Sequence, residues 1–226
     1  MIDLLTLNLF FYPFFILVVL ISIFGYGQLV NRIILTNNLD LDFKNLIFIK
    51  GLIFTGFISI FINIYFPISD YVSLLIIFLG SILYFFYFIK NLNKKKEIIF
   101  ILFILILSFF YSFYAGVSDD FHYHYETIKN FKNKNLFEIL HHRNVSYNSH
   151  WLFLTSIFSI STFTSTLFII TSLFYSISIY DFFNLTKTSI KKQKYHLSII
   201  SFFCLVFFLG VLSQMKDLGT DVPGVI

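Results

Sequence analysis

The side chains most able to do chemistry gather in one polar stretch, residues 116–151. It holds adjacent carboxylates, five of the six histidines and the only tryptophan. Asp119 and Asp120 are neighbours, and two carboxylates this close do not ionise independently. Such a group suits a general base that takes a proton from an attacking hydroxyl. The alternative is structural, because Asp is favoured at the start of a helix.

The histidines form two pairs, His122 with His124 and His141 with His142. Together with an acid they could bind a divalent metal, although this spacing does not require one. It differs from the i, i+4 pair of a helical metal site, and the two pairs meet only if the loop folds back. The alternative is a set of interfacial side chains that hydrogen-bond lipid headgroups or each other.

Arg143 is one of two arginines in a lysine-rich chain. Its planar guanidinium suits a bidentate grip on phosphate, or else a salt bridge to Glu138. A later polar segment contributes Asp217 and Asp221. Acids from two successive loops on one side of a membrane could converge over one cavity.

Composition assigns these side chains to a membrane protein. Of 226 residues, 58% are hydrophobic and 12% are charged, and the mean hydropathy is +0.83. Since a soluble domain carries about a quarter charged residues, a soluble enzyme, a disordered tail and a nucleic-acid-binding module are excluded. The single cysteine, Cys204, excludes a disulfide framework and a CxxC metal site.

Six apolar runs are long enough to cross a bilayer, which needs roughly 20 helical residues. They are 4–30, 46–66, 71–89, 98–115, 164–183 and 195–211, and a seventh begins at Pro223. Lipid offers the backbone no hydrogen-bond partner, so each run is expected to be a helix. The prediction is an all-α, polytopic bundle of about six complete spans, forming one transmembrane unit over 1–226. The first run is read as a retained span rather than a signal peptide.

Orientation follows from the Lys and Arg residues between the spans. Eleven of the sixteen fall in 31–50, 90–97 and 181–194. These segments are therefore predicted to be cytoplasmic, and 67–70, 116–149 and 212–222 are predicted to lie outside. Within the outer loop, 116–163, apolar residues at helical spacing predict an amphipathic interfacial helix over 125–140, with Lys129, Lys132 and Lys134 between them. A second interfacial helix is predicted over 152–160, with Trp151 in the aromatic belt.

Small residues predict where helix backbones approach closely. In a chain with one alanine, the pairs Ser161/Ser165 and Ser172/Ser176 are the candidates. A moderately polar helix beside an aqueous cavity explains the same pattern.

The order of these motifs resembles a known pattern. Asp119, Tyr123-His124, His141-His142-Arg143 and Asn148-Ser149-x-Trp151 resemble those of poorly characterised bacterial multi-spanning proteins that look like GT-C membrane glycosyltransferases. The resemblance covers about 110–226. His150 departs from its usual serine, and the spacing from Arg143 to Trp151 is one residue longer. GT-C cores have several more spans, so the resemblance implies that this chain is an N-terminal fragment.

The resemblance implies a bacterial inner-membrane protein that transfers a sugar from a polyprenyl-phosphate carrier at the outer face. Asp119, or alternatively Asp120, would be the general base. Substrate would be bound by the following residues: Tyr123, His124, His141, His142, Arg143, Asn148, Asp217 and Asp221. The alternatives are a transporter or flippase, which needs ionisable residues at mid-bilayer depth, and a non-catalytic subunit of polysaccharide assembly.

Overall fold

The computed structural model describes residues 2–34, 44–90, 94–114, 121–140, 150–161 and 164–210. Within these ranges the regular structure is helical, which confirms the all-α prediction. The helices are α1 (Ile2–Ile34), α2 (Lys44–Tyr65), α3 (Asp70–Lys90), α4 (Lys94–Tyr114), α5 (Phe121–Asn133), α6 (Leu136–Leu140), α7 (His150–Ile157), the 3-10 helix η2 (Thr164–Phe168), α8 (Ile169–Lys191) and α9 (Tyr195–Gly210).

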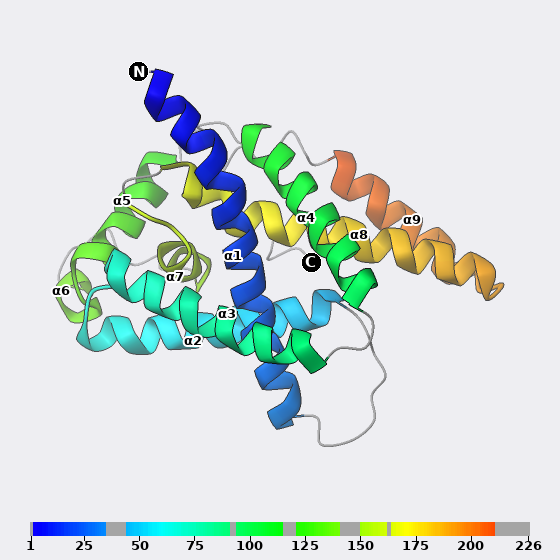
Figure 1. Cartoon of the computed structure of the whole chain (residues 1–226), viewed down its shortest axis with the longest axis horizontal. Helices are drawn as coiled ribbons and strands as arrows, with labels where there is room; N and C mark the ends of the chain where they lie inside the picture. The colour runs from blue at the N-terminus through cyan, green and yellow to red at the C-terminus, as the bar shows by residue number, and fades with distance from the viewer. Residues whose placement is uncertain are drawn as a thin grey trace.

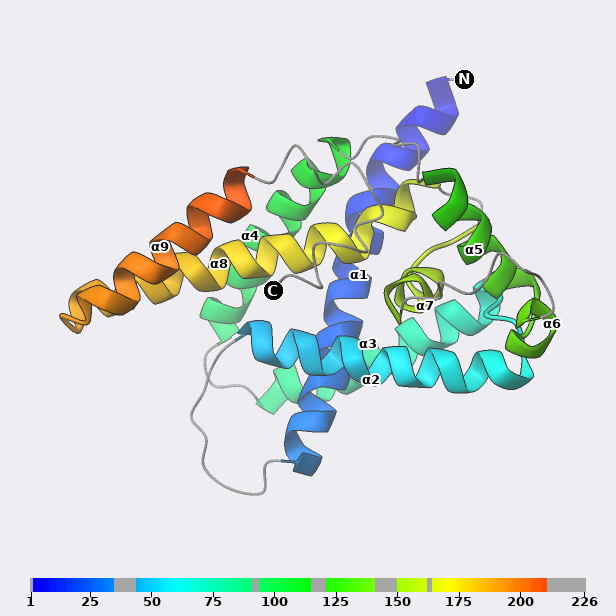
Figure 2. The same ribbon diagram turned by 180° about the vertical axis from the view of Figure 1, so that it is seen from behind.

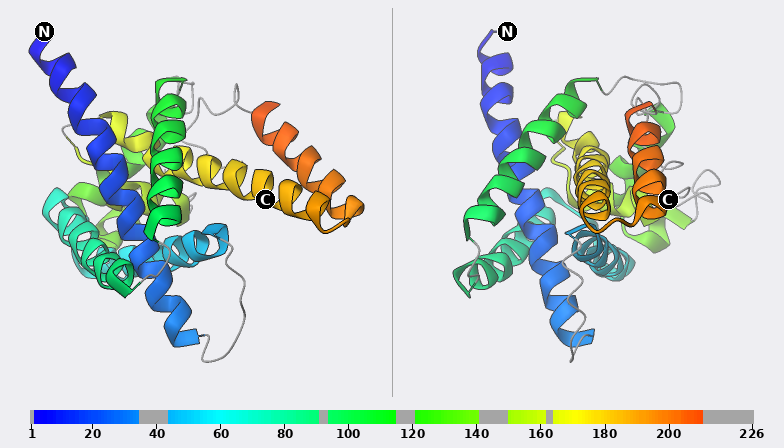
Figure 3. Two further views of the ribbon diagram at one scale, coloured as in Figure 1. Left: turned by 45° about the vertical axis from the view of Figure 1, so that its right-hand side comes forward. Right: turned by 90° about the vertical axis from the view of Figure 1, so that its right-hand side faces the viewer.

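Helix α1 runs between two groups of helices (Figures 1 and 2). On one side lie α2, α3 and the short helices α5, α6 and α7, and on the other lie α4, α8 and α9. The main contacts of α1 are with α3 and α2, whereas α8 packs chiefly on α9 and α4. Figure 3 shows α8 and α9 side by side, joined by a short turn. The architecture therefore places α1 and the first half of α8 at the centre.

Among the described residues, four helices are long and apolar enough to cross a membrane. They are Phe11–Ile33, Leu46–Tyr65, Asp70–Ile89 and Thr166–Lys191, and they match the first, second, third and fifth predicted spans. Helices α4 and α9 occupy the fourth and sixth, but their described parts do not meet the same length and apolarity. The seventh lies outside the described residues. An all-α architecture with four candidate spans among the described residues is shown, and the prediction of six complete spans is not confirmed.

The outward faces of the peripheral helices are apolar. On α3, Phe78, Phe85 and Phe86 are each at least 60% exposed, whereas Ile77 is buried against the rest of the bundle. A water-soluble helix has the opposite pattern, with polar residues outward. Large apolar patches mark surfaces that bind another apolar phase or a partner, and these faces suit contact with lipid chains.

Glycines set the closest approaches of the helix backbones. A Cβ at Gly25 of α1 would collide with the carbonyl oxygen of Gly80 in α3, and one at Gly27 would collide with that of Ile47 in α2. Gly51 of α2 meets the backbone of α1 in the same way. Small residues allow such close helix contacts in membranes. Glycines in the first three spans therefore make close helix contacts that the sequence analysis did not predict.

One of the two predicted serine pairs does join helices. The hydroxyl of Ser108 in α4 donates to Ser176 Oγ at 2.9 Å, and it also contacts the carbonyl of Ser172 at 3.4 Å. The prediction that Ser172 and Ser176 mark a close helix contact is thus confirmed for α4 and α8. Ser161 plays a different part, described below.

Candidate polar centre and pocket at the ends of the spans

Helices α5 and α6 form the amphipathic segment expected over 125–140. Ile128, Phe131 and Ile139 are buried, as their helical spacing predicts. The helix is interrupted at Asn135, whose Oδ1 accepts the backbone N–H of Glu138 at 2.9 Å while its Nδ2 donates to the Glu138 carboxylate at 2.7 Å. This reciprocal arrangement resembles a capping box, and it starts α6 as a separate turn of helix.

The segment is fixed to the turn between α2 and α3. The carbonyl of Phe131 accepts the backbone N–H of Ile68 at 2.8 Å and the Nδ2 of Asn63 at 3.2 Å. The Phe131 ring stacks on Phe153 of α7 with centroids 3.9 Å apart. The turn 67–70 and the described part of 116–149, residues 121–140, were predicted to share one side of the membrane, and they lie at the same end of the molecule. That this end faces outward stays a prediction.

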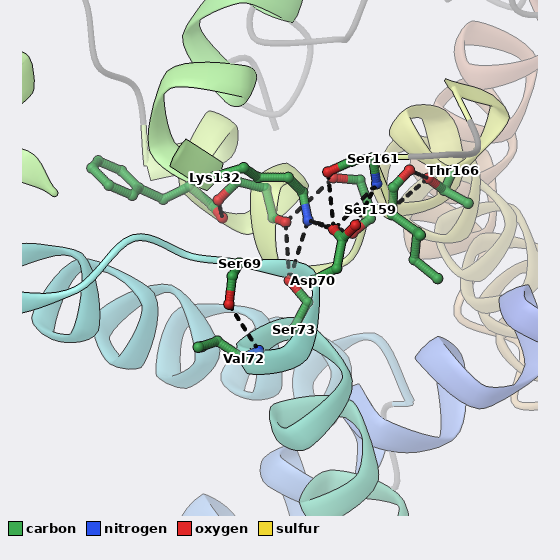
Figure 4. A network of polar contacts seen from close by, with 11 residues as sticks. Ser69, Asp70, Val72, Ser73, Lys132, Ser159, Ser161 and Thr166 are labelled. Carbon is green, nitrogen blue, oxygen red and sulfur yellow. Dashed lines mark hydrogen bonds and ion pairs between the residues drawn. The ribbon is translucent and has the colours of Figure 1, made fainter. Parts of the chain in front are cut away.

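Lys132 is buried at this junction, and its ammonium makes three contacts (Figure 4). Nζ donates to Asp70 Oδ1 and to the Ser159 carbonyl, each at 2.7 Å, and lies 3.4 Å from Ser73 Oγ. The side chain is 5% exposed. The prediction that Lys132 belongs to a solvated polar face is therefore wrong, because its charge is neutralised by Asp70 inside the protein.

Asp70 also connects the Asp70–Lys132 ion pair to a third part of the chain, the loop at Ser161. Its carboxylate accepts the backbone N–H of Ser161 at 3.2 Å and the Ser161 hydroxyl at 3.1 Å. Nearby, Thr166 Oγ1 accepts the N–H of Ile160 at 2.9 Å, which holds the loop between α7 and η2. Asp70 is also the first residue of α3, where a negative charge is favourable. One ion pair thus links α3, α5 and the 159–161 loop.

The electrostatics of Lys132 reflect opposing effects. Burial lowers the pKa of the Lys132 ammonium, while the hydrogen bond and the charge of Asp70 oppose that shift. An ammonium carries three donors, and all three have acceptors here. A cation engaged in this way has no donor left for a ligand, so Lys132 serves as an internal anchor.

A cavity of about 150 Å³ lies directly against this anchor. It is lined by Tyr125, Ile128, Lys129, Lys132, Asn133, Ser159, Ile160, Ser161 and Leu167. Its walls combine an exposed cation, Lys129, with hydroxyl and amide groups and with three aliphatic side chains. This mixture of apolar and polar groups is typical of small-molecule sites, and a volume of about 150 Å³ holds only part of a drug-sized ligand.

The predicted site residues relate to this cavity as follows. Tyr123 and His124 lie in the first turn of α5; the His124 side chain is half-buried, and that of Tyr123 is outside the described residues. Tyr125, the next residue, is the aromatic that lines the cavity. The other predicted residues lie outside the described ranges: Asp119, Asp120, His141, His142, Arg143, Asn148, Asp217 and Asp221. Helix α5 begins directly after Asp120, as the capping alternative requires.

Two further expectations are settled by packing. Trp151 is 9% exposed and meets Phe174 of α8 edge-on, with centroids 5.9 Å apart. It is therefore a core residue, and its placement in an aromatic belt is wrong. For the metal alternative, no group of three His, Cys, Asp or Glu side chains comes together within the described part of the chain, which does not include the His141-His142 pair.

Sequence reasoning missed Asp70, Lys132, Ser159 and Ser161 as one cluster. A signal for Lys132 was present, because it follows Ile128 by four residues and therefore shares its buried helix face. A lysine on such a face requires an acid, and Asp70 is the acid of the turn assigned to the same side. The loop serines carry no comparable signal.

Comparison with known proteins identifies the family of the chain but no activity. A family model described as Domain of unknown function (DUF8201) matches residues 10–226. No curated protein and no solved structure matches the chain. Function must therefore be argued from the residues themselves.

Proposed function

The chain belongs to the DUF8201 family, and we propose that it is the membrane part of a glycosyltransferase that uses a polyprenyl-phosphate-linked sugar. The observation that carries the proposal is the position of the cavity. It lies where α2 ends, where α3 begins and where the span that starts at Thr166 begins. A lipid-linked phosphate lies at this level of a bilayer, so its headgroup and the cavity would meet.

The sequence supplies the chemistry next to the cavity. Asp119 and Asp120 directly precede α5, whose later turns form the cavity wall. In the proposed reaction Asp119, with Asp120 as the alternative, takes a proton from the acceptor hydroxyl. That oxygen attacks the anomeric carbon, and the bond to the carrier phosphate breaks.

The remaining predicted residues hold the two substrates. Arg143, with His141 or His142, stabilises the phosphate as negative charge grows on it. Tyr123, His124 and Asn148 contact the sugar or the acceptor. Asp217 and Asp221 belong to a second acidic segment, which the same proposal assigns to substrate binding.

The base assignment predicts a loss of activity without a loss of folding. In the full-length protein, Asp119→Asn should lower sugar transfer by a factor of at least about 100, the lower range for general base catalysis. Transfer is measured in membranes with radiolabelled polyprenyl-phosphate sugar, and membrane insertion is checked by immunoblot. Full activity of Asp119→Asn with inactive Asp120→Asn would move the role to Asp120. Full activity of both variants would contradict the proposal.

One observation favours a transporter as the second candidate. Helix α8 continues to Lys191, so Asp181 lies well inside the candidate span Thr166–Lys191. A carboxylate at that depth is typical of ion and substrate pathways. A transporter requires no base at Asp119, so the variant that abolishes sugar transfer would leave transport intact. A non-catalytic subunit likewise tolerates changes at Asp119, His124 and Arg143.

A further inference from the structure

The cavity beside α5 contains a cation that no residue in the described part of the chain neutralises. Lys129 is exposed on the cavity wall, one helical turn before Lys132. Within those ranges the structure gives Lys129 neither a hydrogen bond nor an ion pair. Lys132, in contrast, donates to Asp70, Ser73 and Ser159. The Asp70–Lys132 pair contributes no net charge, so among the described residues that line the cavity the net charge is that of Lys129.

The neighbouring charges do not cancel this cation from inside the cavity. Glu126 precedes Lys129 by three residues on α5, but it is exposed and does not line the cavity. Asp70 is engaged by Lys132 and Ser161. Among the residues that line the cavity, an anion would therefore meet the Lys129 ammonium, which has no partner in the described part of the chain, and no carboxylate.

Part of the cavity wall is apolar. Ile128, Ile160 and Leu167 line the cavity together with the polar groups. Leu167 lies at the start of the candidate span Thr166–Lys191, so this wall continues into the membrane-crossing part of the chain. A ligand that matches the cation and the apolar part of the lining has an anionic group joined directly to a hydrocarbon chain.

We infer that this cavity binds the phosphate end of a single-chain lipid phosphate, with Lys129 on the phosphate and Ile160 and Leu167 against the first part of the chain. The identity of that lipid as a polyprenyl phosphate rests on the proposed function. The anion site itself rests on the cavity, on the Lys129 ammonium, which has no partner within the described residues, and on the position of the cavity at the ends of the spans. Lys129 is thereby a binding residue that the resemblance to GT-C proteins does not assign.

Equilibrium binding to the purified full-length protein in detergent tests this site with three probes: polyprenyl monophosphate, the polyprenol of the same length and inorganic phosphate. Lys129→Gln should weaken binding of polyprenyl monophosphate by about tenfold or more, the effect of losing one charge-assisted hydrogen bond. Polyprenol should bind the wild type and Lys129→Gln equally weakly. Inorganic phosphate should compete only at far higher concentration, because it lacks the chain.

Lys134→Gln is the matched control, since Lys134 follows α5 in the same segment and does not line the cavity. It should bind polyprenyl monophosphate like the wild type. Equal weakening by the two variants, or none by Lys129→Gln, would overturn the site. Competition by inorganic phosphate as strong as that by the lipid would overturn the lipid assignment.

Asp119→Asn separates this inference from the proposed function. It should bind polyprenyl monophosphate with wild-type affinity and transfer no sugar. If Lys129→Gln binds polyprenyl monophosphate normally while Asp119→Asn still loses transfer, the Lys129 site is rejected and the proposed function remains. If the wild-type protein binds polyprenyl monophosphate through Lys129 but transfers no sugar, the proposed function is rejected and the Lys129 site remains.

Discussion

Replacing Asp70 with asparagine is expected to destabilise the protein by about 3–5 kcal/mol, the cost of breaking a buried ion pair on one side. The reason is the environment of Lys132, which is 5% exposed and would keep its charge with only neutral hydrogen-bond acceptors around it. Asparagine has nearly the same shape, so the change isolates the charge. The measurement is thermal or denaturant unfolding of the purified protein in detergent.

Removing the cation instead, with Lys132→Met, should lower the free energy of unfolding by less. Lys132→Met leaves Asp70, which is 30% exposed and still accepts two hydrogen bonds from Ser161. Its main cost is the Ser159 carbonyl left without the ammonium, about 1–3 kcal/mol for a buried polar group. The double variant Asp70→Asn/Lys132→Met should therefore be more stable than Asp70→Asn alone. A double variant as unstable as the sum of the two single variants would contradict a coupled buried pair.

Replacing Gly25 with valine is expected to disrupt the packing of α1 on α3. A Cβ at this position falls on the Gly80 carbonyl oxygen and lies 2.8 Å from the Tyr84 backbone nitrogen. Because both groups are backbone, no side chain can move aside, and the helices must separate. Overpacking a core costs about 1–3 kcal/mol when side chains adjust, so the loss here should be at the upper end or beyond. Unfolding in detergent measures it.

Gly210 provides the control for this substitution. It ends α9, and a Cβ there would meet nothing within 4 Å. Gly210→Ala should leave the unfolding midpoint unchanged or raise it slightly, because alanine favours a helix over glycine. If Gly25→Val were as well tolerated as Gly210→Ala, the close contact between α1 and α3 would be wrong.

Helices were predictable because their causes are local. The run 71–89 contains no charged residue, and it forms α3 within one residue at each end. The spacing of Ile128, Phe131 and Ile139 identified the buried face of α5 and α6. For α5 and α6 the period of the apolar residues indicated which side of the helix is covered, whereas for α3 the length of the apolar run was enough to predict the helix.

Long-range pairing was not predictable in the same way. Asp70 and Lys132 are 62 residues apart. Each has an ordinary local explanation: Asp70 begins a helix, and Lys132 belongs to the polar side of an amphipathic segment. Only the docking of α5 onto the α2–α3 turn brings them together. The glycine contacts of α1 likewise depend on which helices cross, and helical spacing does not contain that information.

Whether the cavity faces the outside of the cell decides the proposed chemistry, and one labelling experiment measures it. In a Cys204→Ser background, Glu126→Cys places a thiol at an exposed position of α5, and Lys187→Cys places one at an exposed position near the far end of α8. The Lys and Arg count predicts that a membrane-impermeant maleimide labels Glu126→Cys in intact cells and labels Lys187→Cys only after lysis. Labelling in the reverse order would contradict the orientation and the sugar-transfer proposal built on it.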